Sequence, residues 1–182
     1  DAKKESIETI LEVSDLKING NLKKIIVTGC LAQRYAGEIL KELPEVDAVI
    51  GTGEIDKIEK VIEEVLADKR VVESTKMDFL ADSETDRVLT TASHTAYLKI
   101  AEGCDRKCTY CIIPQLRGSL RSRTIEDILK EANKLVDSGV RELNLLAQET
   151  TEYGIDLYKE KSLARLMKEL VKIDGLKWLR TY

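Results

Sequence analysis

Three cysteines lie close together in the segment CDRKCTYC, at positions Cys104, Cys108 and Cys111. Thiolate is a soft ligand that selects zinc, copper(I) or iron–sulfur clusters. Positions i, i+4 and i+7 suit a shared metal group better than pairwise disulfides. The segment therefore predicts a metal site, and reduced, metal-binding thiols indicate a cytoplasmic protein.

The number of ligands separates the candidate metals. A structural zinc site takes four protein ligands, and the chain's one histidine, His94, lies before this segment and makes a poor fourth ligand. A four-iron cluster usually takes four cysteines, so three would leave one iron open to chelation by a small molecule. The pattern favours a reactive iron–sulfur site, and a non-catalytic zinc or iron–sulfur module is the alternative from another class.

The spacing resembles the signature of the radical S-adenosylmethionine (SAM) superfamily, including the aromatic Tyr110 just before the third cysteine. The resemblance implies a 4Fe-4S cluster on Cys104, Cys108 and Cys111, with SAM bound at the open iron. One electron then splits SAM and releases a radical that removes hydrogen from an unreactive carbon. In such enzymes the cofactors supply the chemistry and the protein positions them.

The wider sequence is similar to the methylthiotransferases. GCDRKCTYCIIPQLRGSLRSR followed by LNLLAQETTEYGIDLY resembles the RimO type, which adds a methylthio group to the β-carbon of an aspartate in the ribosomal small-subunit protein S-twelve. The tRNA-modifying MiaB type is similar around the cysteines but typically carries a GQNVN-like stretch where this chain has AQETT. The resemblance favours the ribosomal protein as partner, with a tRNA (adenosine) methylthiotransferase as the alternative. It also implies an electron donor and a sulfur donor.

The fourth cysteine, Cys30, follows a predicted strand in TGCLAQR, where open α/β sheets place ligands. A lone cysteine at such a place is most often a buried free thiol. The family resemblance instead implies a second 4Fe-4S cluster on three cysteines, and Cys30 matches the last of them. The other two would lie upstream of Asp1, so the second cluster is incomplete in this chain.

Four further residues are candidates for binding SAM. The resemblance places Tyr110 near the adenine, and Gln148 and Glu149 where the superfamily contacts the amino group of SAM. Arg123 ends an arginine-rich stretch before a predicted helix, where cations oppose the helix dipole. An anionic ligand, such as the SAM carboxylate or the target aspartate, would explain that stretch; a solvated loop is the alternative.

The elements that must carry these residues alternate between strands and helices. Two helices of the second half carry start and stop signals: Thr124 with Asp127 forms a capping-box signature before Gly139, and Ser162 precedes a helix that ends by Gly175. Between the halves the pattern dissolves, and only VVES allows a short strand there. The predicted strands are residues 25–28, 46–51, 96–103, 140–148 and 176–182. The predicted helices are an N-terminal one that carries Ile7, Ile10 and Leu11, followed by 31–43, 55–66, 124–139 and 162–175.

This order predicts an α/β fold. We expect a partial flavodoxin-like methylthiotransferase N-terminal domain at residues 1–67, a linker at 68–95, and the first βα units of a radical SAM partial TIM barrel at 96–182. In such folds the working residues lie in loops after the strand C-termini, where the three clustered cysteines and Gln148 fall. Both ends look truncated, and the resemblance implies a further C-terminal substrate-binding domain.

Composition limits the alternatives. Among 182 residues the net charge is −4, which argues against nucleic acid as the modified substrate. No apolar run approaches membrane-spanning length. A single histidine cannot serve a nucleophilic triad, and no Gly-rich phosphate loop is present.

Overall fold

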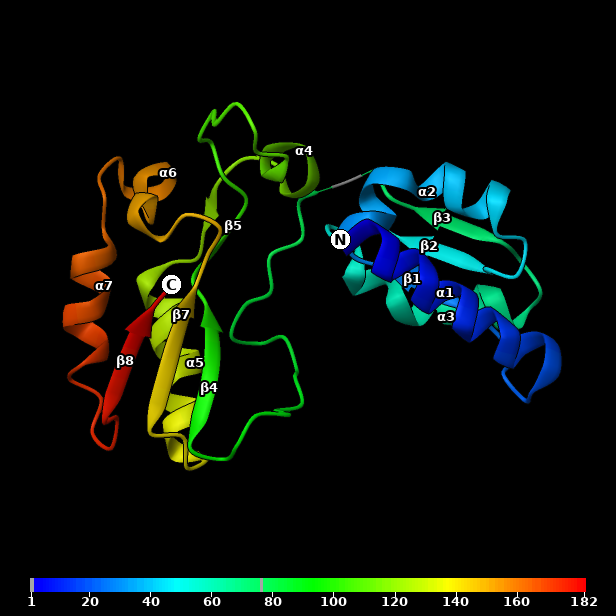
Figure 1. Ribbon diagram of the computed structural model, residues 1–182. Coiled ribbons are helices and arrows are strands. Elements are labelled where there is room, and N and C mark those ends of the chain that lie inside the picture. Colours follow the sequence, from blue (N-terminus) through cyan, green and yellow to red (C-terminus); the bar gives the residue numbers. More distant parts are fainter. Residues whose placement is uncertain (1, 76) are drawn as a thin grey trace. The chain divides into compact units, whose positions relative to one another are not determined.

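The computed structural model describes residues 2–75 and 77–182 (Figure 1). The chain divides into two compact units, Asp1–Phe79 (unit 1) and Leu80–Tyr182 (unit 2). Each unit has its own parallel sheet, and each is described by itself. In the part of the chain that the structure describes, no helix is both long enough and apolar enough to cross a membrane.

Unit 1 is a three-stranded parallel sheet in the order β1-β2-β3 (Figure 1). Parallel neighbours require crossover connections, and α2 and α3 supply them. The run VVES does form a strand, the third of this sheet. The elements are α1 (Ala2–Asn19), β1 (Ile26–Thr28), α2 (Cys30–Glu42), β2 (Ala48–Ile50), the 3-10 helix η1 (Ile55–Lys57), α3 (Ile58–Leu66) and β3 (Val71–Glu73).

The central strand of unit 1 is covered on both faces. All three residues of β2 are fully buried, as expected for a strand between two helical layers. Val49 packs with residues of α1 and α2, whereas Ala48 and Ile50 pack with α3, because successive strand residues point to opposite faces. The α/β fold predicted from the sequence is confirmed, with helices on both faces of a parallel sheet.

Unit 2 carries a second parallel sheet in the order β4-β7-β8, together with a short antiparallel pair, β5-β6. Its core lies between the sheet and the helices α5 and α7 (Figure 1). The elements are β4 (Thr95–Lys99), β5 (Ala101–Glu102), α4 (Ile113–Arg117), β6 (Arg121–Ser122), α5 (Ile125–Asp137), β7 (Glu142–Leu146), the 3-10 helix η2 (Thr150–Glu152), α6 (Ile155–Tyr158), α7 (Leu163–Leu170) and β8 (Trp178–Thr181).

The start of α5 follows the capping signature. Thr124 Oγ1 accepts a hydrogen bond from the Asp127 backbone N–H at 3.2 Å. Gly139 follows the helix with φ +109°, a left-handed conformation that suits glycine. At α7, Ser162 occupies the cap position, but its hydroxyl donates to Glu160 O at 3.1 Å instead of accepting from the helix.

The segment before β4 is held against α5 of unit 2. The Ser83 N–H donates to Asp127 Oδ1 at 2.9 Å, and Lys134 Nζ donates to Ser83 O at 2.7 Å. Arg87 forms an ion pair with Glu131 at 3.1 Å. Part of the polar stretch that the sequence marks as irregular, residues 80–94, belongs to unit 2. Its side chains and backbone have fixed partners on α5.

Candidate functional site

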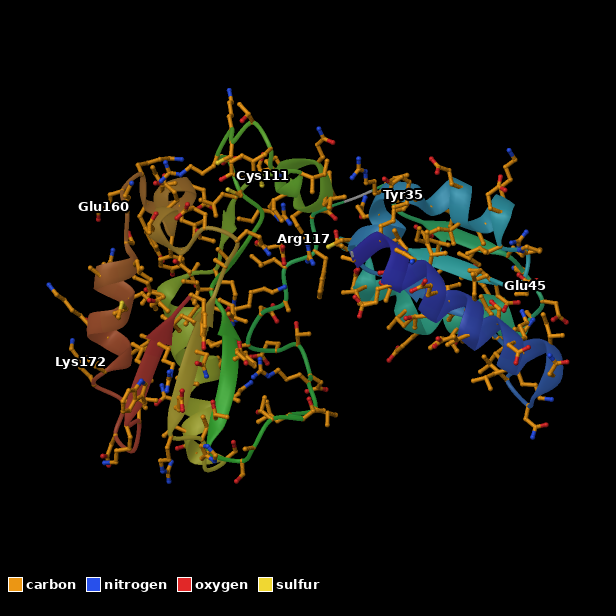
Figure 2. All side chains as sticks on the ribbon, in the orientation of Figure 1. Tyr35, Glu45, Cys111, Arg117, Glu160 and Lys172 are labelled. Atoms are coloured by element: carbon orange, nitrogen blue, oxygen red, sulfur yellow. The ribbon has the colours of Figure 1, made fainter. Side chains whose placement is uncertain are left out.

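The clustered cysteines lie on the loop between β5 and α4, beyond the carboxyl end of β4. Cys104 is buried, Cys111 is half-buried and Cys108 is exposed. The Cys111 N–H donates to Cys108 O at 3.1 Å, so these two residues share a tight turn. Figure 2 labels Cys111 in this loop beside α4. One loop thus carries all three thiols.

The loop is closed at its base. The strand that enters it, β5, pairs with the strand that leaves it, β6, through Ala101↔Ser122 and Glu102↔Arg121. The Cys104 N–H adds a hydrogen bond to Gly118 O at 3.1 Å. The first thiol is therefore fixed at the point where the loop closes.

Glycine is required at position 103. Gly103 has φ +79°, and a Cβ there would lie 2.2 Å from Ser119 O and 2.6 Å from Gly118 O. Both contacts are to backbone atoms that cannot rotate away. The close approach of the two loop ends therefore depends on this residue.

Gln148 connects the cysteine loop to the end of β7. Its Oε1 accepts a hydrogen bond from the Gly103 N–H at 2.8 Å. The carbonyl oxygen of this side chain thus accepts one hydrogen bond inside the protein, and its second lone pair and the amide NH2 remain for a ligand. The structure gives Gln148 a part in positioning the residue before Cys104.

A buried carboxylate stands just before the loop. Glu102 is 5% exposed, and its carboxylate accepts from Lys99 Nζ at 2.6 Å and lies 3.4 Å from Arg117 Nη1. Figure 2 labels Arg117 at the end of α4. A buried charge is tolerated only when it is paired, so these two cations hold Glu102 in place and join the entering strand to α4.

Glu149 begins η2 and has a defined orientation. Its Oε1 accepts hydrogen bonds from both the N–H (3.0 Å) and the hydroxyl of Thr151. These bonds, with a smaller contribution from Arg106, lower the pKa of the Glu149 carboxyl below its usual range. The side chain is therefore a fixed anion at the carboxyl end of the sheet.

Arg123 is built into unit 2. It is 4% exposed, and its guanidinium pairs with Asp127 and Glu131 at 2.6 Å each and donates to Lys99 O at 2.8 Å. Its Nη2 has no hydrogen-bond partner among the described residues. The carboxylates of α5 explain the arginine at this position, and Nη2 is buried as well, so the side chain presents almost no surface to a ligand.

The aromatic residues near the loop differ in their surroundings. Tyr110 is 92% exposed between the second and third cysteines, as a residue that covers a ligand would be. Tyr153 is fully buried and donates its hydroxyl hydrogen to Arg123 O at 2.8 Å. The Tyr158 hydroxyl accepts from the Ile125 N–H at 3.0 Å. Tyr153 and Tyr158 therefore join the segment after β7 to the start of α5.

A small cavity of about 110 Å³ adjoins Cys104 and is also lined by Arg106, Glu149 and Glu152. Arg106 pairs with both carboxylates, and Lys161 pairs with Glu152. The cavity is thus lined by a buried cysteine and by charged side chains that pair with one another.

In unit 1, Cys30 is exposed at the first residue of α2. It is one of the residues that line a hollow of about 580 Å³ between α1 and β1, together with Thr9 and Ile10. Gly29 before it has φ +105°, which turns the chain sharply from strand to helix. The thiol is therefore accessible beside an open hollow.

The turn that bears Cys30 is fastened by Gln33, one helical turn further along α2. Its Nε2 donates to Ser74 O at 2.7 Å, and its Oε1 accepts from the Thr52 N–H at 2.9 Å. A Cβ on Gly51 would lie 2.2 Å from Gln33 Oε1, so the neighbouring turn fits closely round this side chain. One glutamine thus connects the segments that follow β1, β2 and β3.

The donor chemistry suits an iron–sulfur cluster. Over residues 2–75 and 77–182 no three His, Cys, Asp or Glu side chains are gathered so that they could hold one metal ion. In a four-iron cluster each thiolate binds a different iron, so three ligands must surround a volume and need not converge on a point. Three thiols on one loop, two of them at least partly accessible, fit that requirement.

Two family models match the chain. The radical SAM superfamily model matches residues 98–179, and the model described as uncharacterized protein family UPF0004 matches residues 1–51. The first match contains the three clustered cysteines and the second contains Cys30. The chain is thus a radical SAM protein with a UPF0004 segment at its start, and such proteins are expected to use a 4Fe-4S cluster and SAM.

Curated relatives narrow this class. The chain is 57% identical over 180 residues to "Ribosomal protein uS12 methylthiotransferase RimO" of Thermoanaerobacter sp. (strain X514), covering 99% of this chain and 41% of the relative. It is 52% identical over 179 residues to the protein of the same name from Clostridioides difficile (strain 630), covering 98% of this chain and 40% of the relative. The chain belongs to the RimO-type radical SAM methylthiotransferase family, and it spans about 40% of the length of these relatives.

A solved structure supports the fold alone. "Structure of radical S-adenosylmethionine methyltransferase, TsrM, from Kitasatospora setae with cobalamin and [4Fe-4S] cluster bound" matches with a TM-score of 0.54 at 11% identity. The match covers 88% of this chain and 36% of that chain. The α/β fold predicted from the sequence is therefore shared with a radical SAM protein of very different sequence.

Sequence reasoning missed several residues of this site. Glu102, Arg106 and Glu152 look like members of the ordinary charged background, since charged residues make up 34% of the chain. The positions of Glu102 and Arg106, both within two residues of Cys104, were the only available signal. Gln33 gave no signal beyond its nearness to Cys30.

Proposed function

We propose that the protein to which this chain belongs is a radical SAM methylthiotransferase that replaces one β-hydrogen of an aspartate in ribosomal protein uS12 with a methylthio group. The observation that carries the proposal is the identity of 52–57% to RimO proteins over nearly the whole chain. The matched length includes both cysteine-bearing segments. The closed loop with three thiols supplies a site of the required chemistry.

In unit 2 we assign Cys104, Cys108 and Cys111 as the ligands of the cluster that activates SAM. The bound group supplies an electron to SAM and the radical chemistry that follows. The chain's own part is to hold the loop closed at Gly103 and to present a fixed anion, Glu149, to the positively charged amino group of SAM.

Three other residues complete the proposed SAM site. Tyr110, exposed between two cysteines, would cover the adenine. Gln148 would offer the second lone pair of its Oε1 to the amino group of SAM, and Arg123, whose Nη2 is buried, would act by holding the start of α5. Their main contribution is to position the loop and the start of α5.

In unit 1 we assign Cys30 as one ligand of a second 4Fe-4S cluster that handles sulfur. Its exposure and the adjoining hollow are consistent with a larger group bound there. The reaction also requires a sulfur donor and an electron donor, which are further partners of the proposal. Because ribosomal proteins and their modifying enzymes meet in the cytoplasm, we place the protein there.

The assignment of domains is likewise a proposal: residues 1–67 as the methylthiotransferase N-terminal part, 68–95 between the parts and 96–182 as the radical SAM part. Within 68–95, β3 (Val71–Glu73) pairs with β2 and is counted with the first part. The ion pair between Arg87 and Glu131 and the bonds of Ser83 to α5 support counting residues 80–95 with the second part.

The test uses the full-length protein, reconstituted anaerobically with iron and sulfide. Electron paramagnetic resonance (EPR) of the reduced protein should show a cluster signal that SAM perturbs, and substitution of Cys104, Cys108 or Cys111 by Ser should abolish this SAM-sensitive signal while that of the second cluster remains. A signal that SAM leaves unchanged would indicate a non-catalytic metal-binding module.

Substrate choice is tested by competition. The protein is offered uS12 and tRNA together, and mass spectrometry should find the methylthio group on the uS12 aspartate. Modification of tRNA alone would overturn the proposed substrate. Cys30→Ser should stop methylthiolation while SAM cleavage continues, which separates the roles of the two thiol sites.

A further inference from the structure

Arg106 connects the cysteine loop to the segment that follows β7. Its backbone N–H donates to Cys104 Sγ at 3.4 Å. Its guanidinium pairs with Glu152 (Nη2–Oε1, 2.7 Å) and lies near Glu149 (Nε–Oε2, 3.6 Å). A single residue therefore contacts both the buried sulfur and the anion proposed for SAM.

The charges round Arg106 form a short chain. Lys161 Nζ pairs with the same Glu152 oxygen, Oε1, at 2.7 Å. The two carboxylates are the less exposed members, at 26% for the Glu149 side chain and 19% for Glu152, against 50% for Arg106. Arg106, Glu149 and Glu152 line the cavity beside Cys104, together with Asp105, and Lys161 pairs with Glu152.

Folding stability does not explain this arrangement. A partly exposed ion pair contributes about 0.2–1 kcal/mol to stability, and the loop is already closed by β5-β6 pairing and by the Cys104–Gly118 hydrogen bond. The arrangement does fix the Glu149 carboxylate from both sides, because Thr151 occupies Oε1 and Arg106 lies near Oε2.

We propose that Arg106 is a positioning residue that orients Glu149 toward the amino group of SAM and places a positive charge at the cavity that Cys104 also lines. This inference rests on the proposed function, because it gives a role to a residue within that site. Arg106 itself need not touch SAM.

Two measurable consequences follow from electrostatics. Reduction adds negative charge to a cluster, and nearby charges and hydrogen bonds to the sulfurs set its potential. Removing the Arg106 cation should make the midpoint potential more negative. Removing the Glu152 anion should make it more positive, and a merely structural role would not produce opposite signs.

The experiment compares Arg106→Gln, Arg106→Lys and Glu152→Gln in the full-length protein, reconstituted anaerobically. Lys107→Gln is the matched control, since Lys107 is exposed next to Arg106 and its loss changes the net charge equally. The measurements are iron and sulfide content, the midpoint potential from an EPR-monitored redox titration, and the Kd of SAM from its perturbation of the EPR signal.

Arg106→Gln should keep its iron, shift the midpoint to more negative values and weaken SAM binding about three- to fivefold, which corresponds to the loss of one partly exposed charge interaction. Arg106→Lys should recover the potential but only part of the SAM affinity, because an ammonium group lacks the guanidinium fork. Glu152→Gln should shift the midpoint in the opposite direction.

Equal behaviour of Arg106→Gln and Lys107→Gln in both potential and SAM affinity would overturn the inference. Loss of iron in Arg106→Gln alone would assign the residue to loop folding and would overturn it too. If the unaltered protein's cluster does not respond to SAM, the proposed function fails as a whole. If the cluster of the unaltered protein responds to SAM and Arg106→Gln responds in the same way, the proposed function stands and only the role proposed for Arg106 fails.

Discussion

Each unit places a cysteine shortly after a strand, Cys30 after β1 of the parallel sheet and Cys104 after β5 of the antiparallel pair, but the two units fix these cysteines by different means. In unit 2, Cys104 begins a long loop that is closed by its own strand pair and by Gly103. In unit 1, Cys30 begins a helix after one tight turn at Gly29, and Gln33 connects that turn to its neighbours.

The difference shows how the number of thiols shapes the backbone. When one segment provides several ligands, its loop must surround the bound metal group. Hydrogen bonds between the two ends of such a loop are then needed to keep it closed. A single ligand needs only a rigid position, which a helix start provides. The comparison predicts where substitutions destabilise each unit most. In unit 2 these are substitutions at the base of the cysteine loop, and in unit 1 they are substitutions of the side chain that joins the neighbouring turns.

The largest effect is expected at the base of the cysteine loop. Gly103→Ala should lower the free energy of unfolding by about 3 kcal/mol and remove most of the iron, because a Cβ at φ +79° is strained and also meets Ser119 O. Iron analysis after anaerobic reconstitution and urea unfolding measure this.

Gly139→Ala is the control for that change. Gly139 also has a positive φ, +109°, but no heavy atom lies within 4 Å of a Cβ there. Gly139→Ala should lower the free energy of unfolding by about 1–2 kcal/mol, because of backbone strain alone, and the variant should keep its iron. Equal iron loss in the two variants would show that the loop base is not special.

In unit 1, Gln33→Leu should lower the free energy of unfolding by about 2–3 kcal/mol. The change leaves the Thr52 N–H without the Gln33 acceptor and Ser74 O without the Gln33 donor, and an unsatisfied polar group costs about 1–3 kcal/mol. Amide hydrogen exchange should accelerate in the turns after β2 and β3. Gln115→Leu, at an exposed position in unit 2, should leave that exchange unchanged.

The stability of unit 1 should depend on pH through Asp47. Burial raises the pKa of this carboxyl, but hydrogen bonds from Lys17 and the Ile25 N–H outweigh burial and lower it below its ordinary value. The ionised Asp47 carboxylate therefore contributes its full stabilisation of unit 1 above the unfolded-state pKa, about 4. This stabilisation is lost as the pH falls through the lower folded-state pKa.

Asp47→Asn should cost about 1–2 kcal/mol at neutral pH and should flatten the acid loss of stability. Urea unfolding at several pH values, followed by the methyl NMR signals of Val49 and Ile50, measures unit 1 separately. Glu8→Gln, in an exposed pair with Lys4, should leave the profile as it is. An unchanged acid slope in Asp47→Asn would refute this assignment.

The smallest effect concerns helix capping. Thr124→Ala should destabilise α5 by about 1 kcal/mol, because it removes the hydrogen bond to the Asp127 N–H. Ser162→Ala should not show a capping loss, since Ser162 makes no side-chain cap bond to α7. Hydrogen exchange in the first turns of the two helices distinguishes them.

Much of the fold followed from local patterns. Buried β-branched runs predicted β1 and β2, and 3.6-residue stripes predicted α2, α3 and α5, because a strand or helix must bury one face whatever its neighbours are. The cysteine spacing predicted an iron–sulfur site and the radical SAM superfamily, and the wider sequence predicted the RimO type. The assigned roles of the individual cysteines stay predictions.

Other features could not be read from local patterns. Arg123 looked like a loop cation, yet it is buried and paired with Asp127 and Glu131. Arg106 gave no signal, because its carboxylate partners lie after a different strand. Ser162 carried a capping signal that its hydroxyl does not use.

The sequence by itself determined which chemistry this chain can support and which elements it forms, because thiol spacing and hydrophobic periodicity act over a few residues. Only the tertiary structure decided which charges meet beside Cys104 and which glutamines join the turns. Those partners are far apart along the chain and come together only when parallel strands bring their carboxyl ends to one edge.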